Sequence, residues 1–276
     1  NKPEYLIVHL ITSLPLILFY LFNYETKLIL RISGLPKLNF FRRTLWKISG
    51  KFLYRITCPT EETKNNLIKQ GIFDNNKIFL LRDPVIQINQ ILKKKKENIE
   101  NKHKNYILAA GRLTRQKNQI LLIKLMSNLV KKDPDIKMII LGDGEKKEKI
   151  KKEIKKKELE KNIKLIGYQN NIFKYLKNCK CLISTSLWED PGFVMIEAAA
   201  TNCFVISSDC KSGPKEFIGE KRGLLFRNND YKDLIVKFNV FEKMQINEIF
   251  QRKINAKKQS NKYTIFSHHK ELLKIF

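Results

Sequence analysis

From residue 105 onward, short apolar runs that end at glycine alternate with segments whose apolar residues recur at helical spacing, and this alternation constrains the fold most. The first run, 106–110, stops at Gly111, and the next, 136–141, stops at Gly142. Strands that alternate with helices form parallel crossover units, and near-continuous apolar strands are typical of a sheet covered on both faces. The sequence therefore predicts an α/β fold, with further strands at 163–166, 181–184, 203–207 and 223–226.

The first 88 residues show a weaker form of the same pattern, and we interpret them as part of a second domain of this kind. A helix is predicted at 60–70, with Thr60 as its N-cap and Gly71 at its end. Since the chain starts at Asn1 on an apolar segment, we expect an N-terminal portion to be missing. Strands are predicted at 5–9, 28–32, 56–59 and 78–81.

The predicted organisation is two Rossmann-like domains, the first of them incomplete. Residues 1–88 form the partial N-terminal domain, 89–104 the linker and 105–240 the C-terminal domain. Residues 241–276 are expected to form C-terminal helices that pack back toward the N-terminal domain, ending in an amphipathic helix at 263–276.

Residues 5–22 form a nearly uncharged apolar run whose length reaches the lower limit for a membrane span. His9, Ser13 and Pro15 interrupt the run, which weakens the case for a span. We favour a buried strand at 5–9, a loop at 13–15 and then a buried helix.

The chain is strongly basic, with 54 Lys and Arg against 27 Asp and Glu and a net charge of +27. Two interpretations remain open. The cations can form a binding surface for anionic partners such as nucleic acid, phosphates or an acidic membrane. Alternatively, they reflect the composition of an AT-rich genome, with the lysine runs at 93–96 and 146–157 on solvated segments. Weak attraction to anionic lipid is compatible with both.

A first candidate site follows the strand at 106–110. Gly111 allows the chain to turn off the strand, and Arg112 and Lys117 then face the end of the sheet. A diphosphate held without metal needs such cations together with amide donors. The alternative is a basic surface loop, which is common in a chain of this composition.

A second candidate lies after the next strand, where Gly142 and Gly144 would permit close approach of the backbone to a ligand. A simple turn between a strand and a helix explains the same glycines equally well.

The third candidate, from Glu189 to Glu197, carries most of the functional argument. Gly192 precedes a small-residue helix that is predicted at 193–200, so amides at Gly192, Phe193 and Val194 can meet a phosphate. Glu197 is embedded among apolar residues, and a carboxylate is rarely buried without a purpose. It can accept hydrogen bonds from ribose hydroxyls, and Glu189 can reach a sugar. The alternative is one glutamate that caps the turn and one that is exposed.

A fourth stretch, Ser212-Gly213-Pro214-Lys215-Glu216, opens a short helix after the strand at 203–207 and offers another anion contact or a plain connection. Five cysteines without zinc-like spacing and four histidines predict no metal site.

Together, these motifs resemble the retaining glycosyltransferases of family 4, the glycosyl transferases group 1 family. The resemblance is strong from 106 to 226 and weaker before it. It implies the GT-B arrangement, with the donor bound by the C-terminal domain and with no metal or other cofactor. It further implies diphosphate binding and charge stabilisation by Arg112 and Lys117, sugar contact by Glu189 and ribose contact by Glu197.

The same resemblance extends to other residues of the chain. The segment 3–9 is similar to the family's strand that ends in an active-site histidine, so that His9 is a candidate for sugar contact. Gly213 and Glu216 match the family's Gly-Gly-x-x-Glu loop, from which Ser212 departs. The implied donor-binding set is Gly111, Arg112, Lys117, Gly144, Glu189, Gly192, Phe193, Val194, Glu197, Gly213 and Glu216.

We therefore expect an enzyme that moves a sugar from a nucleoside diphosphate donor, a UDP-sugar in the first instance, to a saccharide or lipid-linked acceptor with retention. Synthesis of a surface polysaccharide or lipopolysaccharide, in the cytoplasm and peripherally at the inner face of the membrane, is the expected setting. The family gives no reason to expect a nucleic-acid partner. Two alternatives stay open: a non-catalytic basic protein that binds anionic membrane or nucleic acid, and a sugar phosphorylase or hydrolase on the same fold.

Overall fold

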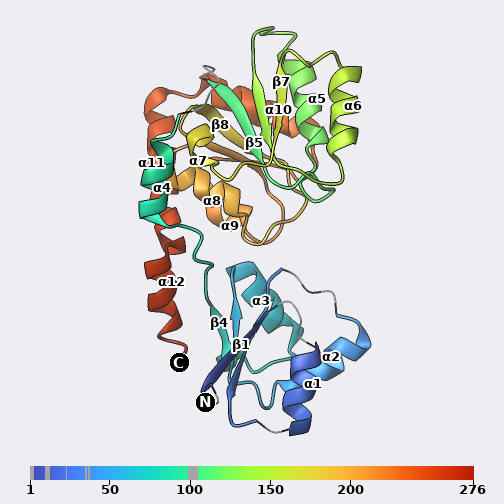
Figure 1. The fold of residues 1–276 in the computed structure, drawn as a ribbon, viewed down its shortest axis with the longest axis vertical. Helices are drawn as coiled ribbons and strands as arrows, with labels where there is room; N and C mark the ends of the chain where they lie inside the picture. Colours follow the sequence, from blue (N-terminus) through green and yellow to red (C-terminus); the bar gives the residue numbers. More distant parts are fainter. Residues whose placement is uncertain (1–2, 10–12, 23, 35, 37, 99–104) are drawn as a thin grey trace. The chain divides into compact units, whose positions relative to one another are not determined.

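A computed structural model describes residues 3–9, 13–22, 24–34, 36, 38–98 and 105–276. The chain forms two compact units: unit 1 comprises Asn1–Asp83 with Phe266–Phe276, and unit 2 comprises Pro84–Ile265. Each unit contains a parallel sheet flanked by helices, which confirms the predicted fold class (Figure 1).

Unit 1 has a four-stranded sheet in the order β1-β2-β3-β4, with all neighbours parallel. A helix connects each strand to the next. The strands are β1 (Tyr5–His9), β2 (Lys27–Arg31), β3 (Arg55–Cys58) and β4 (Ile78–Leu80), and the helices are α1 (Ser13–Phe22), α2 (Phe40–Ser49) and α3 (Glu61–Gln70).

The two faces of this sheet bury different side chains, since successive residues of a strand point to opposite sides. Leu28 and Leu30 of β2 pack with Leu16 of α1 and Trp46 of α2, so α1, α2 and α3 cover one face. Ile29 packs on the other face with Leu81 and Ile275 near the C-terminus.

Helix α3 begins and ends as its sequence predicts. The Thr60 side chain accepts a hydrogen bond from the Thr63 N–H (3.2 Å), and Gly71 adopts a left-handed conformation with φ of 59°. Both caps satisfy backbone groups that the helix itself leaves without partners.

Helix α1 differs from the prediction in two ways. The residues expected to form a loop, 13–15, are its first turn, where the missing N–H of Pro15 costs no intrahelical bond. The helix is also not buried, because a helix that covers a sheet turns only one stripe inward: Leu16 is buried, but Leu14, Leu21 and Phe22 are exposed. The strand predicted at 5–9 is present, but it is not buried: Leu6 and Ile7 are exposed on β1, the edge strand of the described sheet. Residues 10–12 of the apolar run lie outside the described part. No helix of the described residues has the length and apolar character needed to cross a membrane.

Unit 2 has a six-stranded parallel sheet in the order β10-β9-β8-β5-β6-β7. The chain winds outward from β5 in one direction and from β8 in the other, and ligands of such sheets bind where the winding reverses, at the carboxyl ends of the strands. All six predicted strands are present, with ends shifted by a residue or two: β5 (Tyr106–Ala110), β6 (Met138–Leu141), β7 (Ile163–Gly167), β8 (Cys179–Ser184), β9 (Val205–Ser208) and β10 (Leu224–Phe226).

Helices cover both faces of this sheet (Figure 1). Ile107 and Ala109 of β5 face one core, with α5 (Ile120–Leu129), α6 (Lys147–Lys156) and α10 (Tyr231–Lys243). Tyr106 and Leu108 face the other core, with α7 (Phe173–Leu176), α8 (Phe193–Ala200), α9 (Pro214–Ile218) and α11 (Ile246–Ser260). This two-sided burial explains why the strands are uniformly apolar.

The linker predicted at 89–104 is partly a helix, α4 (Ile88–Lys95), that belongs to unit 2. Ile91 is buried in the core with Phe173, and the Asn171 side chain donates a hydrogen bond to the Lys94 carbonyl (2.9 Å). The prediction followed the lysines and overlooked the apolar residues spaced three apart at 88 and 91. Residues 99–104 lie outside the described part.

The C-terminal segment divides between the units. Helix α11 packs on α8 within unit 2, whereas residues from Phe266 onward belong to unit 1. The final helix, α12 (Ile265–Leu272), is shorter than predicted. The first boundary between the units lies at Asp83 and Pro84, earlier than the expected residue 88.

Candidate functional site

A cavity of about 450 Å³ in unit 2 brings together residues from both main sequence motifs. Arg112, which follows β5, and Glu197 of α8 line the same cavity, so they lie on the same side of the sheet. The lining consists of Lys94, 110–112, 141–143, 168–170, 172, 173, Val194 and Glu197.

The loop that carries Arg112 is held by its neighbours. The Gln119 side chain donates to the Arg112 carbonyl (2.9 Å), and the Leu113 N–H donates to the Asp143 carbonyl (2.8 Å). These bonds fix the backbone on both sides of Arg112 while its side chain extends toward the cavity. Asp143 also lines the cavity, and its carboxylate is paired with Lys147 (2.7 Å).

The glycines at 142 and 144 are required by packing between loops. A Cβ on Gly142 would lie 1.9 Å from the Gly111 carbonyl oxygen, and one on Gly144 would lie 2.7 Å from that of Leu113. Gly111 and Gly142 line the cavity, but Gly144 is outside its described lining. The close approach at Gly144 is therefore made by the neighbouring loop, which was not anticipated from the sequence.

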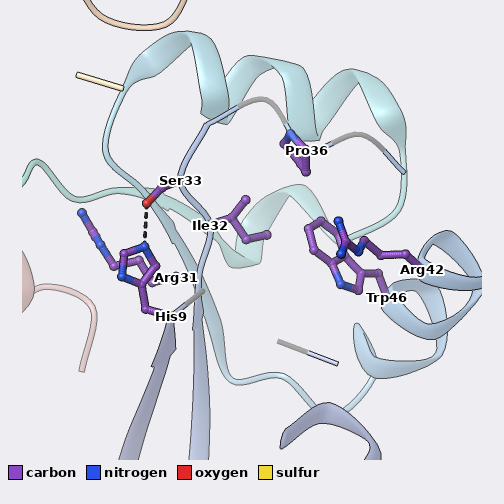
Figure 2. A pocket seen from close by; sticks show the side chains of 7 residues that line it. All are labelled: His9, Arg31, Ile32, Ser33, Pro36, Arg42 and Trp46. Carbon is purple, nitrogen blue, oxygen red and sulfur yellow. Dashed lines mark hydrogen bonds between the residues drawn. The ribbon is translucent and has the colours of Figure 1, made fainter. Parts of the chain in front are cut away.

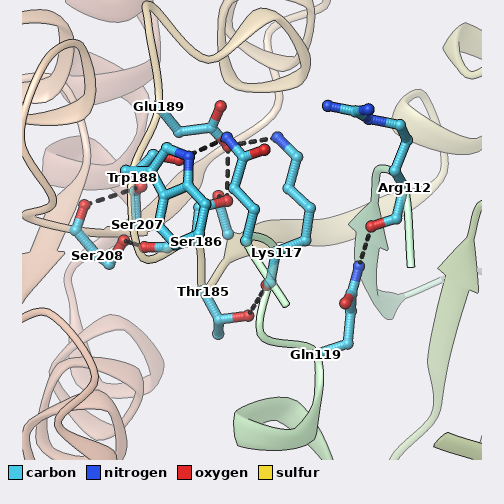
Figure 3. A network of polar contacts seen from close by, with 11 residues as sticks. Arg112, Lys117, Gln119, Thr185, Ser186, Trp188, Glu189, Ser207 and Ser208 are labelled. Atoms are coloured by element: carbon cyan, nitrogen blue, oxygen red, sulfur yellow. Dashed lines mark hydrogen bonds and ion pairs between the residues drawn. The ribbon is translucent and has the colours of Figure 1, made fainter. Parts of the chain in front are cut away.

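Lys117 and Glu189 form an ion pair beside this cavity (Figure 3). The Ser186 hydroxyl donates to the same carboxylate oxygen (2.6 Å), and Glu189 is only 9% exposed. Thr185 donates to the Lys117 carbonyl (2.9 Å) and fixes the loop. The pair lines a small hollow that shares Ala110 and Val194 with the larger cavity, so the two sites adjoin.

The start of α8 offers backbone donors to these cavities. Gly192 precedes the helix with φ of 96°, a conformation that favours glycine. The N–H groups of Phe193 and Val194 have no hydrogen-bond partner among the described residues, whereas that of Met195 donates to the Gly192 carbonyl (3.2 Å). Unpaired N–H groups and the helix dipole together attract anions.

Glu197 lies one turn into α8, where its surroundings disfavour the charged form. Burial raises the pKa of this carboxyl to about 7, and the positive charge of Lys94 opposes the rise. Lys94 reaches the cavity from α4, and its ammonium lies 6.0 Å from the centre of the Phe173 ring. The carboxyl can thus change its charge near neutral pH.

The stretch at 212–216 has a packing role. A Cβ on Gly213 would lie 2.2 Å from the Pro191 carbonyl oxygen, and the Ser212 hydroxyl donates to the Asp190 carboxylate (3.1 Å). These contacts hold the loop between Glu189 and α8. Glu216 is half-buried in α9 and lies outside the described lining of both cavities.

His9 lies in unit 1 and lines a separate cavity of about 200 Å³ (Figure 2). Its Nε2 is 2.8 Å from the Ser33 hydroxyl oxygen. Burial, and then the charge of Arg31, lower the pKa of the imidazole, which favours its neutral form. Arg31 itself donates to the Leu81 carbonyl and pairs with Asp83.

Sequence reasoning missed several residues of the large cavity. Lys94 was hidden in a stretch interpreted as a linker, although the apolar spacing around it indicates a helix. Tyr168, Gln169 and Asn170 follow β7, and their position after a strand end was the available signal. No group of three or more metal-ligating side chains occurs among the described residues, and all five cysteines are free thiols.

Similar proteins were found by sequence. The chain is 32% identical over 238 residues to an uncharacterized glycosyltransferase of Methanocaldococcus jannaschii, covering 79% of this chain and 58% of that protein. It is also 30% identical over 233 residues to a Campylobacter jejuni enzyme, the N-acetylgalactosamine-N,N'-diacetylbacillosaminyl-diphospho-undecaprenol 4-alpha-N-acetylgalactosaminyltransferase. This match covers 82% of this chain and 60% of that protein. The chain thus spans somewhat over half the length of these relatives.

Similar folds occur among solved structures. A mutant of S. aureus TarM, in complex with fondaparinux, alpha-GlcNAc-glycerol and UDP, matches with a TM-score of 0.74 and 25% identity over 92% of this chain and 52% of that one. A glycosyltransferase from Rickettsia africae matches in fold with a TM-score of 0.82 and 16% identity, covering 99% of this chain and 76% of that one.

The family model described as "Glycosyl transferases group 1" matches residues 90–261, which is more than half of the chain and includes both main motifs. The chain belongs to the glycosyl transferases group 1 family.

Proposed function

We propose that this chain binds a nucleoside diphosphate sugar, with UDP as the nucleotide, and transfers the sugar to a saccharide or lipid-linked acceptor. The shared cavity of Arg112 and Glu197 carries this proposal, because a cation and a half-buried carboxylate in one cavity can serve as the phosphate and ribose contacts of a single donor. Two relatives support it: the TarM structure is a complex with UDP, and the Campylobacter jejuni relative is a transferase named for a diphospho-undecaprenol substrate.

Each part of the donor has a complementary group in unit 2. Arg112, Lys117 and the N–H groups of Phe193 and Val194 hold the diphosphate, and the Glu197 carboxylate accepts hydrogen bonds from the ribose hydroxyls. Glu189 contacts the transferred sugar. Because Lys117 pairs with Glu189, a phosphate that binds Lys117 would compete with that carboxylate. His9 of unit 1 is assigned to sugar contact.

The reaction breaks the bond between the anomeric carbon and the β-phosphate oxygen and forms a bond from that carbon to an acceptor hydroxyl. The hydroxyl attacks from the face that the phosphate leaves, so the anomeric configuration is retained. Its proton passes to the departing phosphate oxygen. Arg112, Lys117 and the amides of α8 stabilise the charge that develops on the diphosphate, without a metal ion.

The biological setting in this proposal is synthesis of a surface polysaccharide or lipopolysaccharide. A lipid-linked acceptor would place the protein in the cytoplasm, peripherally at the inner face of the membrane. The excess of basic residues supports contact with anionic lipid headgroups.

The test is an assay of UDP-glucose, UDP-N-acetylglucosamine and UDP-N-acetylgalactosamine, in which released UDP is measured and the product anomer is assigned by NMR. Retention of configuration with at least one donor is expected. An inverted product would overturn the mechanism, and failure to bind any of the three donors would overturn the function.

A further inference from the structure

The stretch between Glu25 and Glu61 of unit 1 differs in charge from the rest of the chain. It contains no acidic residue, although the whole chain has 27 Asp and Glu in 276 residues. Its eight cations are Lys27, Arg31, Lys37, Arg42, Arg43, Lys47, Lys51 and Arg55. A purely compositional excess of lysine would not also remove the acids from this stretch.

Helix α2 lies in this stretch and exposes large apolar side chains. Phe40 is 88% exposed and Phe41 is 67% exposed, and Ile48 is also exposed, whereas Trp46 faces the core. Phe41 and Ile48 are seven residues apart, close to two full turns, and share one outward stripe of the helix. Isolated exposed apolar residues are ordinary, but two adjacent phenylalanines on a basic helix are not.

Cations border this apolar stripe. Arg43 and Lys47 are four residues apart, so they lie one above the other on the surface of α2. Both are exposed, and neither forms an ion pair within the part of the chain that the structure describes. The helix therefore presents an apolar stripe beside a row of unpaired positive charge.

We propose that the outward face of α2, formed by Phe40, Phe41, Arg43, Lys47 and Ile48, docks on a bilayer that contains anionic phospholipid. Aromatic side chains beside lysine and arginine are the composition of helices that lie in the membrane interface. The charges favour an anionic bilayer as the partner. An apolar protein surface would bury Arg43 and Lys47 without any negative charge to pair with them.

Within unit 1, helix α2 packs inward on the sheet and sideways on α1. Helices α1, α2 and α3 follow the strand order β1-β2-β3-β4 on one face, and α1 packs on the side of α2 toward the open edge at β1. A further strand added at β1 would meet α1 first. Phe40, Phe41 and Ile48 stay exposed, so no element of the described residues covers the outward face of α2.

If the proposed function holds, docking through α2 would place the His9 cavity near the lipid-linked acceptor. Arg42 and Trp46 line the His9 cavity from α2, across from Ser33 (Figure 2). A helix held at the headgroup layer would bring this cavity to the depth at which the polar part of a lipid-linked acceptor lies.

The test uses flotation of the whole chain with vesicles of phosphatidylcholine alone or mixed with phosphatidylglycerol. The wild type is expected to bind the mixed vesicles and to be released by salt. Arg43→Gln/Lys47→Gln should weaken binding by roughly thirtyfold, or about fivefold for each cation. Phe40→Ser/Phe41→Ser should weaken it by at least about tenfold.

Matched controls remove the same kinds of residue elsewhere, so that an effect of this surface can be distinguished from a general effect of charge or apolar content. Lys149→Gln/Lys152→Gln removes the same charge from α6, and Phe250→Ser/Phe266→Ser removes two other exposed phenylalanines (53% and 77%). Both controls should bind as the wild type does. Equal losses in the controls, absence of binding to the mixed vesicles, or a wild-type dimer that Phe40→Ser/Phe41→Ser converts to monomer would each overturn the proposal. Denaturation of every variant, followed by the fluorescence of Trp46 in the core of unit 1, shows that unit 1 is folded. UDP binding by every variant, measured separately, keeps this result independent of the donor site.

Discussion

At the scale of single residues, Glu197 is the group whose chemistry depends most on its surroundings. Burial raises the pKa of its carboxyl from 4.5 to about 7, and Lys94 opposes that rise. The folded protein therefore binds the proton more tightly than the unfolded chain does, so the contribution of Glu197 to stability declines as the pH rises from 4.5 through 7. The affinity for a ligand that contains ribose should instead increase with pH, because ribose hydroxyls donate hydrogen bonds to the ionised carboxylate.

Uridine affinity should therefore rise between pH 6 and pH 8 and level off above the pKa of Glu197. Uridine carries no phosphate, so the ligand itself does not titrate in this range. Glu197→Gln should weaken binding at pH 8 by about 2 kcal/mol, or roughly thirtyfold, and should remove the pH dependence. Calorimetric titrations at several pH values measure both effects. A pH profile that persists in the variant would contradict the ribose assignment.

Lys94 should act on the same equilibrium. Lys94→Gln removes the charge that favours ionised Glu197, so the rise in uridine affinity should move to higher pH. The matched control is Lys93→Gln on the same helix, because Lys93 is outside the described lining of the cavity. An unshifted midpoint in Lys94→Gln would show that Lys94 does not act on Glu197.

At the scale of elements, the loops that follow β5 and β6 form one unit in which backbone packs on backbone. Gly142 lies against the Gly111 carbonyl, and the Leu113 N–H donates to the Asp143 carbonyl. Such contacts leave no room for a side chain at Gly142. The position of Arg112 therefore depends on a residue that itself carries no chemistry.

Gly142→Ala should disturb this pair of loops. The new Cβ would lie 1.9 Å from a backbone oxygen, so we expect a loss of stability beyond the roughly 1–2 kcal/mol of left-handed strain, together with weaker UDP binding. Gly167→Ala is the control, since Gly167 also has positive φ (92°) but has open space at its Cβ. Chemical denaturation of both variants measures the difference. Equal losses would show that the contact between the loops does not matter.

The elements of unit 2 were predictable because each strand is a short apolar run closed by a turn signal. The helix at 193–200 and the caps of α3 were also predictable, from glycine and threonine at their ends. Helix α4 was not, because four lysines in a row outweighed two apolar residues in the pattern. The pairing of Lys117 with Glu189 was not predictable either, since it joins loops 72 residues apart.

At the scale of the whole molecule, the two units bury separate cores. In unit 1, the helices pack on a core that contains Leu30 and Ile56. In unit 2, helices pack on both faces of the sheet and form two cores. The residues proposed to hold the donor lie in unit 2, whereas His9 lies in unit 1. Donor binding should therefore stabilise one unit directly.

Differential scanning calorimetry should resolve two unfolding transitions. UDP at a hundredfold excess over its dissociation constant should raise the free energy of unfolding of unit 2 by about 2.7 kcal/mol. The transition temperature of unit 1 should stay unchanged. Trp46 fluorescence reports on unit 1 and Trp188 fluorescence on unit 2, so variants that keep one tryptophan assign the transitions. A single transition that shifts as a whole would contradict independent cores.

The central claim is that Arg112 and Glu197 hold a nucleoside diphosphate in one cavity of unit 2. Isothermal titration of UDP in the presence of EDTA tests it most directly, on the wild type, Arg112→Gln and Glu197→Gln. The account predicts binding by the wild type without metal and a loss of about tenfold or more in each variant. No binding at millimolar UDP, binding that requires a metal ion, or unchanged affinity in both folded variants would contradict it.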